Sequence, residues 1–297
     1  MNILLSGASG FIGQQLLKLD GDNVIHRCVT RTVDPNKYTN FYVENIDAHT
    51  IWDGAFNNID AVVHLAGIAH NKSQVKDEIF GTNTEGTIKF AHDAVKAGVK
   101  RFVFVSTAAI DDETSFNREA SSFQTQSKYD AEVGLKQLAD QTGLELVIVR
   151  PTLVYGANAP GNFGLLVKLV NKIPISPFGL VNNKRDFISI QNLVSLLLLC
   201  ASHPNAHGQT FLASDGEPVS IKDFTNAIAK GTNKSLIHFP VPVGIMKAVG
   251  RLIGKEAIVE QLVGDLKVDS SKAKRMLGWQ PHYSMQQAMQ LLLENKQ

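Results

Sequence analysis

Short apolar runs alternate with longer amphipathic stretches through the first half of the chain. The runs have the length of β-strands and are apolar throughout, which is typical of strands buried on both faces of a parallel sheet. They cover residues 2–6, 24–31, 41–43, 60–67, 102–107 and 144–150. Between them, helical spacing of apolar residues predicts long helices over Ser73–Gly98 and Ser121–Thr142. This alternation predicts an α/β fold with a doubly wound parallel sheet covered by helices on both faces.

The regular alternation stops after Arg150 and Pro151. Prolines and glycines are frequent between Pro160 and Gly179, which predicts a second lobe built on loops. Residues 208–212 have the pattern of a strand that returns to the sheet, and the chain from Ser220 onward is mostly helical. We therefore expect two domains, a large one over residues 1–150 with 186–215 returning to it, and a smaller C-terminal α/β lobe over 151–185 and 216–297.

Three glycines spaced three apart separate the first strand from the first helix. The turn contains Gly7, Ser9, Gly10, Phe11, Ile12 and Gly13. Glycine lets the backbone approach a bound diphosphate, whose charge is favoured by the free N–H groups of the helix N-terminus. The turn is not a P-loop, because Gln14 follows Gly13 where that motif needs a lysine. An ordinary strand–helix turn is the alternative, but the position between the first strand and first helix favours nucleotide binding.

Parallel strands end at one edge of the sheet, so the residues that follow them should share one cleft. These residues are Gly7, His64 to Gly67, Ser106, Thr107 and Arg150. At the end of the second strand an acidic residue would select NAD, but Thr30 and Arg31 stand there, which favours NADP(H) over NAD(H). The alternative is that Arg31 only ends the strand at the surface. Asn45 and Ile46 stand in a polar turn that could touch the adenine.

Composition narrows the function classes. The 297 residues are 44% apolar and 19% charged with a net charge of +1, so no overall field attracts nucleic acid or an anionic membrane. Cys28 and Cys200 lie in apolar runs and are expected to be buried free thiols, and the histidines form no metal-ligand motif. Met1 leads directly into the first strand, and the longest apolar run, Leu193–Ala201, is too short to span a bilayer. We expect a cytoplasmic protein without a metal.

Further motifs extend over nearly the whole chain. They are Gly7-x-x-Gly10-Phe11-Ile12-Gly13, Asp60-Ala61-Val62-Val63-His64-Leu65-Ala66, Asn83-x-x-Gly86-Thr87, Phe104-Val105-Ser106-Thr107, Ser127-Lys128, Arg150-Pro151-x-x-Val154-Tyr155-Gly156, Arg185-Asp186-Phe187 and Leu277-Gly278-Trp279-x-Pro281. Together they resemble the extended short-chain dehydrogenase/reductase superfamily, in its NAD-dependent epimerase/dehydratase branch. Within that branch, the chain is similar to bacterial UDP-sugar 4-epimerases and 4-keto-sugar reductases of surface polysaccharide synthesis.

The resemblance implies hydride transfer between a nicotinamide and C4 of a UDP-linked hexose. In the family, a tyrosine exchanges the hydroxyl proton, helped by a Ser/Thr hydroxyl and by a lysine four residues after the tyrosine. Thr107 falls on the hydroxyl position, with Ser106 beside it, and Lys128 falls on the lysine. Gln124 stands where the tyrosine should be, and an amide has no proton to exchange near neutral pH. Tyr129 cannot replace it, because adjacent helix residues point about 100° apart.

Three explanations of Gln124 stay open. The site has lost catalysis and keeps only binding, or Thr107 or a bound water relays the proton slowly, or a tyrosine from elsewhere, such as Tyr155, approaches. We therefore expect an NAD(P)-dependent UDP-hexose 4-epimerase or 4-keto-sugar reductase, whose activity is impaired under the second explanation. The alternative is a catalytically inactive protein that binds NAD(P) or a nucleotide sugar.

The resemblance also implies binding residues and partners. The large domain would bind NAD(P), with further cofactor contacts from Leu65, Ala66, Gly67, Ser106, Lys128 and Pro151. In the small lobe, Asn162 and Arg185 match residues that hold the diphosphate, and Asp265 would lie near the uridine ribose, although Leu262 replaces the family's arginine. The alternatives are a loop asparagine, an ion pair of Arg185 with Asp186, and a helix-capping aspartate. A homodimer through the two long helices is implied, with no nucleic acid or membrane partner.

Overall fold

The computed structural model describes residues 1–20, 24–31, 38–69, 75–110, 116–119 and 121–294. The chain divides into two units. Unit 1 consists of Met1–Pro151, Leu193–Ala213 and Ser270–Gln280, and unit 2 consists of Thr152–Asn192, Ser214–Asp269 and Pro281–Gln297. The segment expected to return to the large domain thus does so from Leu193, and residues 270–280 also belong to unit 1. The functions assigned to the two domains stay predictions.

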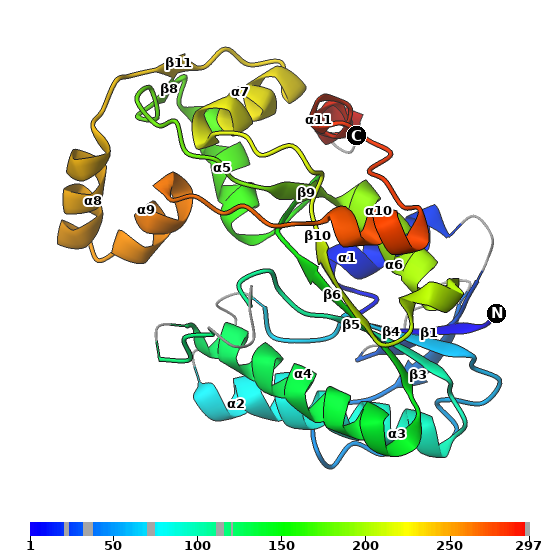
Figure 1. The fold of residues 1–297 in the computed structure, drawn as a ribbon. Coiled ribbons are helices and arrows are strands. Elements are labelled where there is room, and N and C mark those ends of the chain that lie inside the picture. The colour runs from blue at the N-terminus through cyan, green and yellow to red at the C-terminus, as the bar shows by residue number, and fades with distance from the viewer. Residues whose placement is uncertain (21–23, 32–37, 70–74, 111–115, 120, 295–297) are drawn as a thin grey trace. The chain divides into compact units, whose positions relative to one another are not determined.

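A parallel sheet lies at the centre of unit 1 (Figure 1). Its strands are β1 (Ile3–Ser6), β2 (Ile25–Thr30), β3 (Thr39–Tyr42), β4 (Ala61–His64), β5 (Arg101–Val105), β6 (Glu145–Pro151) and β10 (Gln209–Ala213). Among the described residues, seven strands are hydrogen-bonded in the order β10-β6-β5-β4-β1-β2-β3, with parallel pairing throughout. The predicted doubly wound sheet and the returning strand are confirmed, and the strand order reverses between β1 and β4.

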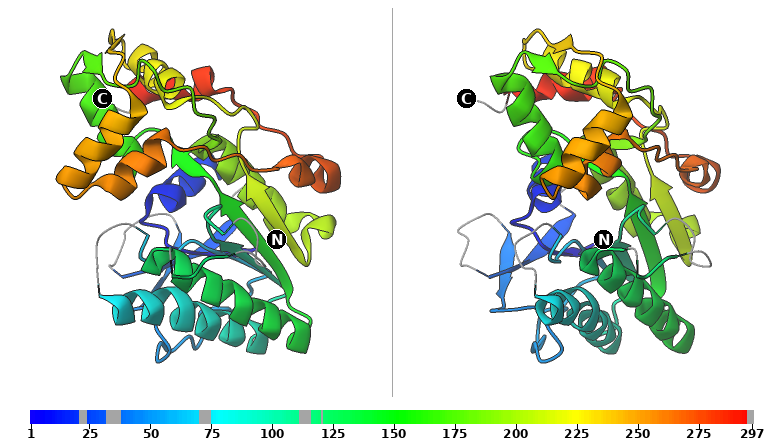
Figure 2. Two further views of the ribbon diagram at one scale, coloured as in Figure 1. Left: turned by 60° about the vertical axis from the view of Figure 1, so that its left-hand side comes forward. Right: turned by 90° about the vertical axis from the view of Figure 1, so that its left-hand side faces the viewer.

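Helices cover both faces of this sheet. On one face lie α2 (Lys76–Phe80), α3 (Thr87–Lys96) and α4 (Phe123–Thr142), and on the other lie α1 (Phe11–Leu19) and α6 (Ile190–Ser202). The views in Figure 2 show α3 and α4 side by side along the sheet. The 3₁₀ turn η2 (Pro204–Ala206) and α10 (Ser271–Leu277) lie near β10. Between the sheet and α3, the rings of Trp52 and Phe90 pack with centroids 4.4 Å apart.

The first long helix contains a π-helical segment. Ser73, its predicted first residue, lies outside the described residues, and the helix runs as α2, the segment η1 (Gly81–Gly86) and α3. Asn83 of η1 is buried, and its amide accepts from Ile68 N at 2.7 Å and donates to Ile68 O at 3.2 Å. The same amide donates to Ser127 Oγ on α4 at 3.0 Å. The π turn therefore fastens the loop after β4 to the start of α4.

Unit 2 contains two short pairs of parallel strands and several helices. The pairs are β7 (Leu153–Tyr155) with β9 (Phe187–Ser189), and β8 (Ile175–Ser176) with β11 (Ile237–His238). The helices are α5 (Gly161–Lys172), α7 (Ile221–Gly231), α8 (Val243–Leu252), α9 (Glu256–Val263) and α11 (Met285–Glu294). The mostly helical tail and the α/β character of the smaller lobe agree with the sequence pattern.

The prediction that residues 160–179 are built on loops is wrong over α5. Pro160 stands just before the helix, where its missing N–H costs no hydrogen bond. Phe163, Leu166 and Val170 recur at helical spacing and are buried. Burial of this apolar stripe outweighs the low helix propensity of the glycines at 161 and 164.

Cys28 and Cys200 are both buried and form no disulfide with each other, as predicted. Burial raises the pKa of the Cys200 thiol to about 12. In the described part of the chain, none of the helices has the length and apolar character that a membrane span requires.

Candidate functional site

The turn after β1 leaves no room for side chains at two of its glycines. Gly7 has φ +74°, and a Cβ there would lie 2.7 Å from the backbone nitrogen of Ala66. A Cβ at Gly13 would overlap the carbonyl oxygen of Gly7. Gly10 precedes α1, and no side chain caps this helix, so the N–H groups of its first turn face outward to any anion bound there.

Hydrogen bonds join the carboxyl ends of the neighbouring strands. Leu65 N donates to Ser6 O at 3.2 Å, beside the glycine turn. Ser106 N, directly after β5, donates to a β6 carbonyl at 2.8 Å, and Ala108 N donates to Pro151 O at 2.9 Å. The residues that the structure brings to this edge are Gly7, Leu65, Ala66, Gly67, Ser106, Thr107 and Pro151. Their placement follows the sequence prediction, while their contacts to a cofactor stay a prediction.

Two buried hydroxyl oxygens at this edge have no hydrogen-bond partner among the described residues. They are Thr30 Oγ1, at the end of β2, and Ser106 Oγ, directly after β5. An unsatisfied buried hydroxyl costs on the order of 1–3 kcal/mol unless a ligand or water pairs with it. The two hydroxyls, the glycine turn and the uncapped α1 fit a ligand that carries both a diphosphate and ribose hydroxyls.

The other predicted adenosine contacts lie near the β2 side of the sheet. Arg31 is exposed directly after β2. The carbonyl of Asn45 accepts from Thr50 Oγ1 at 3.0 Å, which closes a turn. Ile46 packs against the core, and its carbonyl lies where a Cβ on Gly86 of η1 would stand. The guanidinium of Arg31 is open to solvent, which is compatible with both alternatives for this residue. The preference for NADP(H) over NAD(H) stays a prediction.

Lys128 extends from α4 to the end of β5. Its Nζ donates to the carbonyl oxygens of Val105 and Ser106, each at 3.1 Å. Burial lowers the pKa of the Lys128 ammonium to about 8, and the nearby carboxylate of Glu132 acts in the opposite direction. Lys128 is thus fixed to the end of β5, and its match to the family's lysine stays a prediction.

Gln124 lies one helical turn before Lys128. It belongs to the first turn of α4, and its backbone carbonyl accepts from Ser127 Oγ at 3.0 Å. Tyr129, the residue after Lys128, points about 100° away from it around α4, and its ring stacks on Phe116 with centroids 4.5 Å apart. Thr107 Oγ1 accepts from Ala109 N at 3.2 Å, which leaves its O–H able to donate to a substrate.

His64 has a structural role that the sequence did not reveal. The ring nitrogens of this buried residue pair with Ser6 Oγ at 2.7 Å and Thr87 Oγ1 at 2.9 Å. Burial, together with the charge of Lys128, lowers the pKa of His64 to about 3. A neutral histidine therefore joins β1, β4 and α3 below the edge. The pairing of its two nitrogens depends on distant residues, so no local sequence signal indicated it.

Arg150 was expected to face the ligand edge, and the structure corrects this. Its Nε donates to Glu132 Oε1 at 3.0 Å, and both side chains are buried. A buried guanidinium requires a paired carboxylate, and α4 supplies one beneath the sheet edge. Arg150 thus anchors α4 to β6.

Within unit 2, the three predicted substrate residues converge on the end of α9. Asn162 Nδ2 donates to Gln261 Oε1 at 3.2 Å, and Arg185 Nη1 donates to Gly264 O at 2.8 Å. Asp265 accepts from the backbone N–H of the residue before Arg185 at 2.7 Å. Burial lowers the pKa of the Arg185 guanidinium, and Asp265 raises it. Substrate binding by these residues stays a prediction.

Two sequence alternatives do not match the contacts in unit 2. Asp186 is buried and accepts from Val268 N at 3.0 Å, rather than forming a surface ion pair with Arg185. Tyr155 is fully buried, and its hydroxyl donates to Asp215 Oδ2 at 2.7 Å. Burial and the Asp215 carboxylate raise the pKa of Tyr155 far above its ordinary value. Tyr155 is therefore unsuited to replace the missing acid/base.

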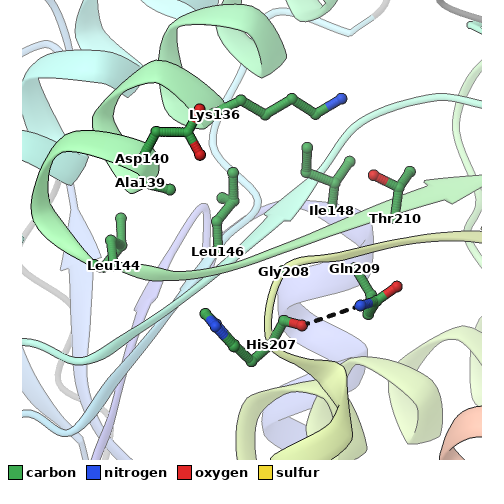
Figure 3. Close-up of a pocket in the computed structure, with 11 residues that line it drawn as sticks. Lys136, Ala139, Asp140, Leu144, Leu146, Ile148, His207, Gly208, Gln209 and Thr210 are labelled. Atoms are coloured by element: carbon green, nitrogen blue, oxygen red, sulfur yellow. Dashed lines mark hydrogen bonds between the residues drawn. The ribbon is translucent and has the colours of Figure 1, made fainter.

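A pocket of unit 1 lies at the opposite edge of the sheet (Figure 3). It is lined by the last turns of α4, including Asp140, and by the first residues of β6 and β10, including Leu146 and Gln209. None of the predicted site residues lines it. The carboxyl edge is therefore the better candidate site.

Comparisons with known proteins identify relatives of this chain. Residues 3–213 match the model of the NAD dependent epimerase/dehydratase family. The chain is 38% identical to a Vibrio cholerae protein named UDP-glucose 4-epimerase, covering 96% of this chain and 92% of that protein.

Solved structures share the fold. One is UDP-glucose 4-epimerase from Thermotoga maritima with UDP-glucose, at a TM-score of 0.77 and 22% identity over 99% of this chain and 98% of that chain. Another is UDP-glucuronic acid 4-epimerase from Bacillus cereus in complex with NAD, at a TM-score of 0.77 and 19% identity over 99% of this chain and 96% of that chain.

The glycine turn generates a first prediction. Gly13→Ala should lower the free energy of unfolding by about 1–3 kcal/mol, because the new methyl group overlaps the Gly7 carbonyl. Dinucleotide affinity, measured by calorimetry, should fall at least about tenfold as α1 shifts. The matched control is Gly244→Ala in α8, where nothing lies within 4 Å of a Cβ, and wild-type affinity is expected. Wild-type dinucleotide affinity in Gly13→Ala would contradict the prediction that the glycine turn binds the diphosphate.

Proposed function

This chain belongs to the NAD dependent epimerase/dehydratase family, and from that premise we propose that it is a UDP-hexose 4-epimerase. The observation that carries the proposal is the carboxyl edge of the sheet. The glycine turn lies there at the end of β1, and the Ser106 hydroxyl, which has no partner among the described residues, and the strand-bound Lys128 lie at the end of β5. Similarity to the Vibrio cholerae epimerase over nearly the whole chain supports it.

The cofactor contacts follow from this edge. The diphosphate would lie on the Gly7–Gly13 turn and the first turn of α1, and Thr30 with Arg31 would meet the adenosine ribose. Ser106 would hold the nicotinamide half, beside Lys128 at the end of β5. The chemistry that a bound nicotinamide would supply is the transfer of a hydride from C4 of the sugar and back. Thr107 and the amide of Gln124 are suited to orient the C4 hydroxyl.

Substrate recognition would come from unit 2. A UDP diphosphate carries negative charge that suits a charge-assisted contact with Arg185, and the amide of Asn162 can donate to the same group. Asp265 would accept from the uridine ribose hydroxyls. The same residues would also suit reduction of a 4-keto sugar. In that reaction, as in epimerisation, a hydride is transferred at C4 and a proton at the C4 oxygen. The homodimer through the two long helices stays an expectation from the resemblance, and the cytoplasmic location stays an expectation from the sequence.

Gln124 favours a second candidate function. Without the tyrosine, the chain would be a catalytically inactive protein that binds NAD(P) or a nucleotide sugar. Only the first function requires turnover of a sugar.

The two functions give opposite results in one assay. Purified protein with NAD⁺ or NADP⁺ should interconvert UDP-glucose and UDP-galactose, followed by chromatography of the sugar nucleotides. Dinucleotide binding without conversion of any UDP-hexose supplied would contradict the epimerase and support the binding protein.

The variant Gln124→Tyr tests how much turnover is lost because an amide stands at position 124. A phenol one helical turn before Lys128 restores the family's proton donor, and such groups contribute about 10²–10⁴-fold, so we expect a gain of turnover up to that range. Gln124→Phe is the matched control and should give no gain, because it adds the ring without the hydroxyl. A loss of turnover in Gln124→Tyr would mean that the amide itself has a catalytic role.

The variant Arg185→Ala tests the substrate contact. A charge-assisted hydrogen bond contributes about 1.5–3 kcal/mol, so the KM for UDP-glucose should rise by roughly 10–150-fold with little change in kcat. Dinucleotide affinity should stay at the wild-type value, and thermal melting checks that the fold is intact. Lys184→Ala, at the exposed neighbouring position, is the control and should leave the KM unchanged. An unaltered KM in folded Arg185→Ala would refute the diphosphate contact.

A further inference from the structure

We propose that Lys128 itself exchanges the C4 hydroxyl proton, in place of the missing tyrosine. The inference rests on the proposed epimerase function and concerns the acid/base of that same site. It differs from the role implied by the resemblance, in which the lysine only supports a tyrosine.

Other candidate groups are occupied by structural contacts. The Tyr129 ring is stacked on Phe116, and the Tyr155 hydroxyl is buried against Asp215 in unit 2. Both ring nitrogens of His64 are hydrogen-bonded to hydroxyls below the edge. Among these groups and Lys128, the lysine alone combines a position at the strand ends with a proton that can leave near neutral pH.

The hydrogen bonds of Lys128 leave one position on Nζ from which a proton can be exchanged. An ammonium has three N–H bonds, and two of them point to the carbonyl oxygens of Val105 and Ser106. Carbonyl oxygens only accept, so both bonds persist in the neutral amine, which has two N–H bonds and one lone pair. The third tetrahedral position carries the proton in one form and the lone pair in the other. Protonation can therefore change without moving the side chain.

The charges around Lys128 allow both forms. On α4, Glu132 favours the ammonium, but its carboxylate is shared with the buried guanidinium of Arg150 on β6. On β4, His64 is neutral, and on β5 the two carbonyl dipoles favour the ammonium. Burial opposes the charge, and the resulting pKa of about 8 leaves both forms populated near neutral pH. A group that must take and return a proton in one catalytic cycle works best under that condition.

The proton transfer balances with oxidation at C4. The hydroxyl O–H bond breaks, its proton bonds to the Nζ lone pair, and the O–H electron pair becomes the second C4–O bond. The C4 hydrogen leaves with its electron pair to the oxidant, a nicotinamide dinucleotide. Reduction of the other face of the ketone reverses each change, and Nζ returns the proton to the oxygen.

Direct titration of Lys128 tests its ionisation without any substrate. In protein labelled with ¹⁵N-lysine, the Nζ signal that disappears in Lys128→Arg identifies the residue. Its shift should titrate with a midpoint near 8, whereas an ordinary lysine titrates at about 10.4. A midpoint above about 10 would overturn the proposed role.

Kinetics test the proton transfer itself. Lys128→Arg keeps the cation and its donors but cannot lose a proton, so kcat at saturating dinucleotide should fall by about 10²–10⁴-fold. Lys136→Arg, two turns further along α4, is the control and should keep wild-type turnover. Wild-type kcat/KM should rise with pH and level off above about 8, since the ammonium has no lone pair to accept the proton. If Lys128 only bound the cofactor, arginine would replace it with little loss of kcat at saturating dinucleotide. A kcat of Lys128→Arg above one tenth of the wild-type value would therefore contradict the proposed proton transfer.

The outcomes separate the inference from the function on which it rests. Sugar turnover by the wild type together with a high Lys128 midpoint would overturn the role of Lys128 alone. Absence of turnover with every UDP-hexose would overturn the epimerase, and the proton transfer with it, whatever the midpoint.

Discussion

The close approach of backbone at the end of β1 is the constraint on which the candidate site depends. Gly7 lies so near Ala66 that any side chain would displace the loop after β4, and Gly13 lets α1 begin against the Gly7 carbonyl. These contacts place an uncapped helix N-terminus where the strand order of the sheet reverses. A bound diphosphate would meet the free N–H groups of the first turn of α1 there.

A second set of contacts holds α4 against the same edge. Asn83 in the π segment binds Ser127, Arg150 binds Glu132, and Lys128 binds the end of β5. The helix α4 is thus fixed from three elements, and Gln124 lies in its first turn. The resemblance implies a tyrosine at position 124, and a glutamine there cannot carry the proton that a phenol would carry. At this edge, the half-buried amine of Lys128 has two of its N–H groups bound to carbonyl oxygens and one position left for a substrate.

Periodic features of this fold were predictable, and features that depend on distant partners were not. Continuous apolar strands alternating with helices indicated the parallel sheet and its ligand edge, because each signal is local. Arg150 follows the same pattern, but its direction depends on Glu132, eighteen residues away. Pro160 and the nearby glycines made the segment of α5 resemble a loop in the sequence. It forms a helix because its stripe of apolar residues is buried. The π turn arises where Asn83 binds Ile68 and Ser127, which no helical periodicity reveals.

The central claim is that the sheet edge of unit 1 binds a nicotinamide dinucleotide. A native mass spectrum of the protein as purified, repeated after addition of NAD⁺ or NADP⁺, tests it without assuming any substrate. We predict one dinucleotide on each chain, with a mass that also distinguishes NAD from NADP by one phosphate. A spectrum of the chain alone under both conditions, with no dinucleotide retained or taken up, would contradict the claim.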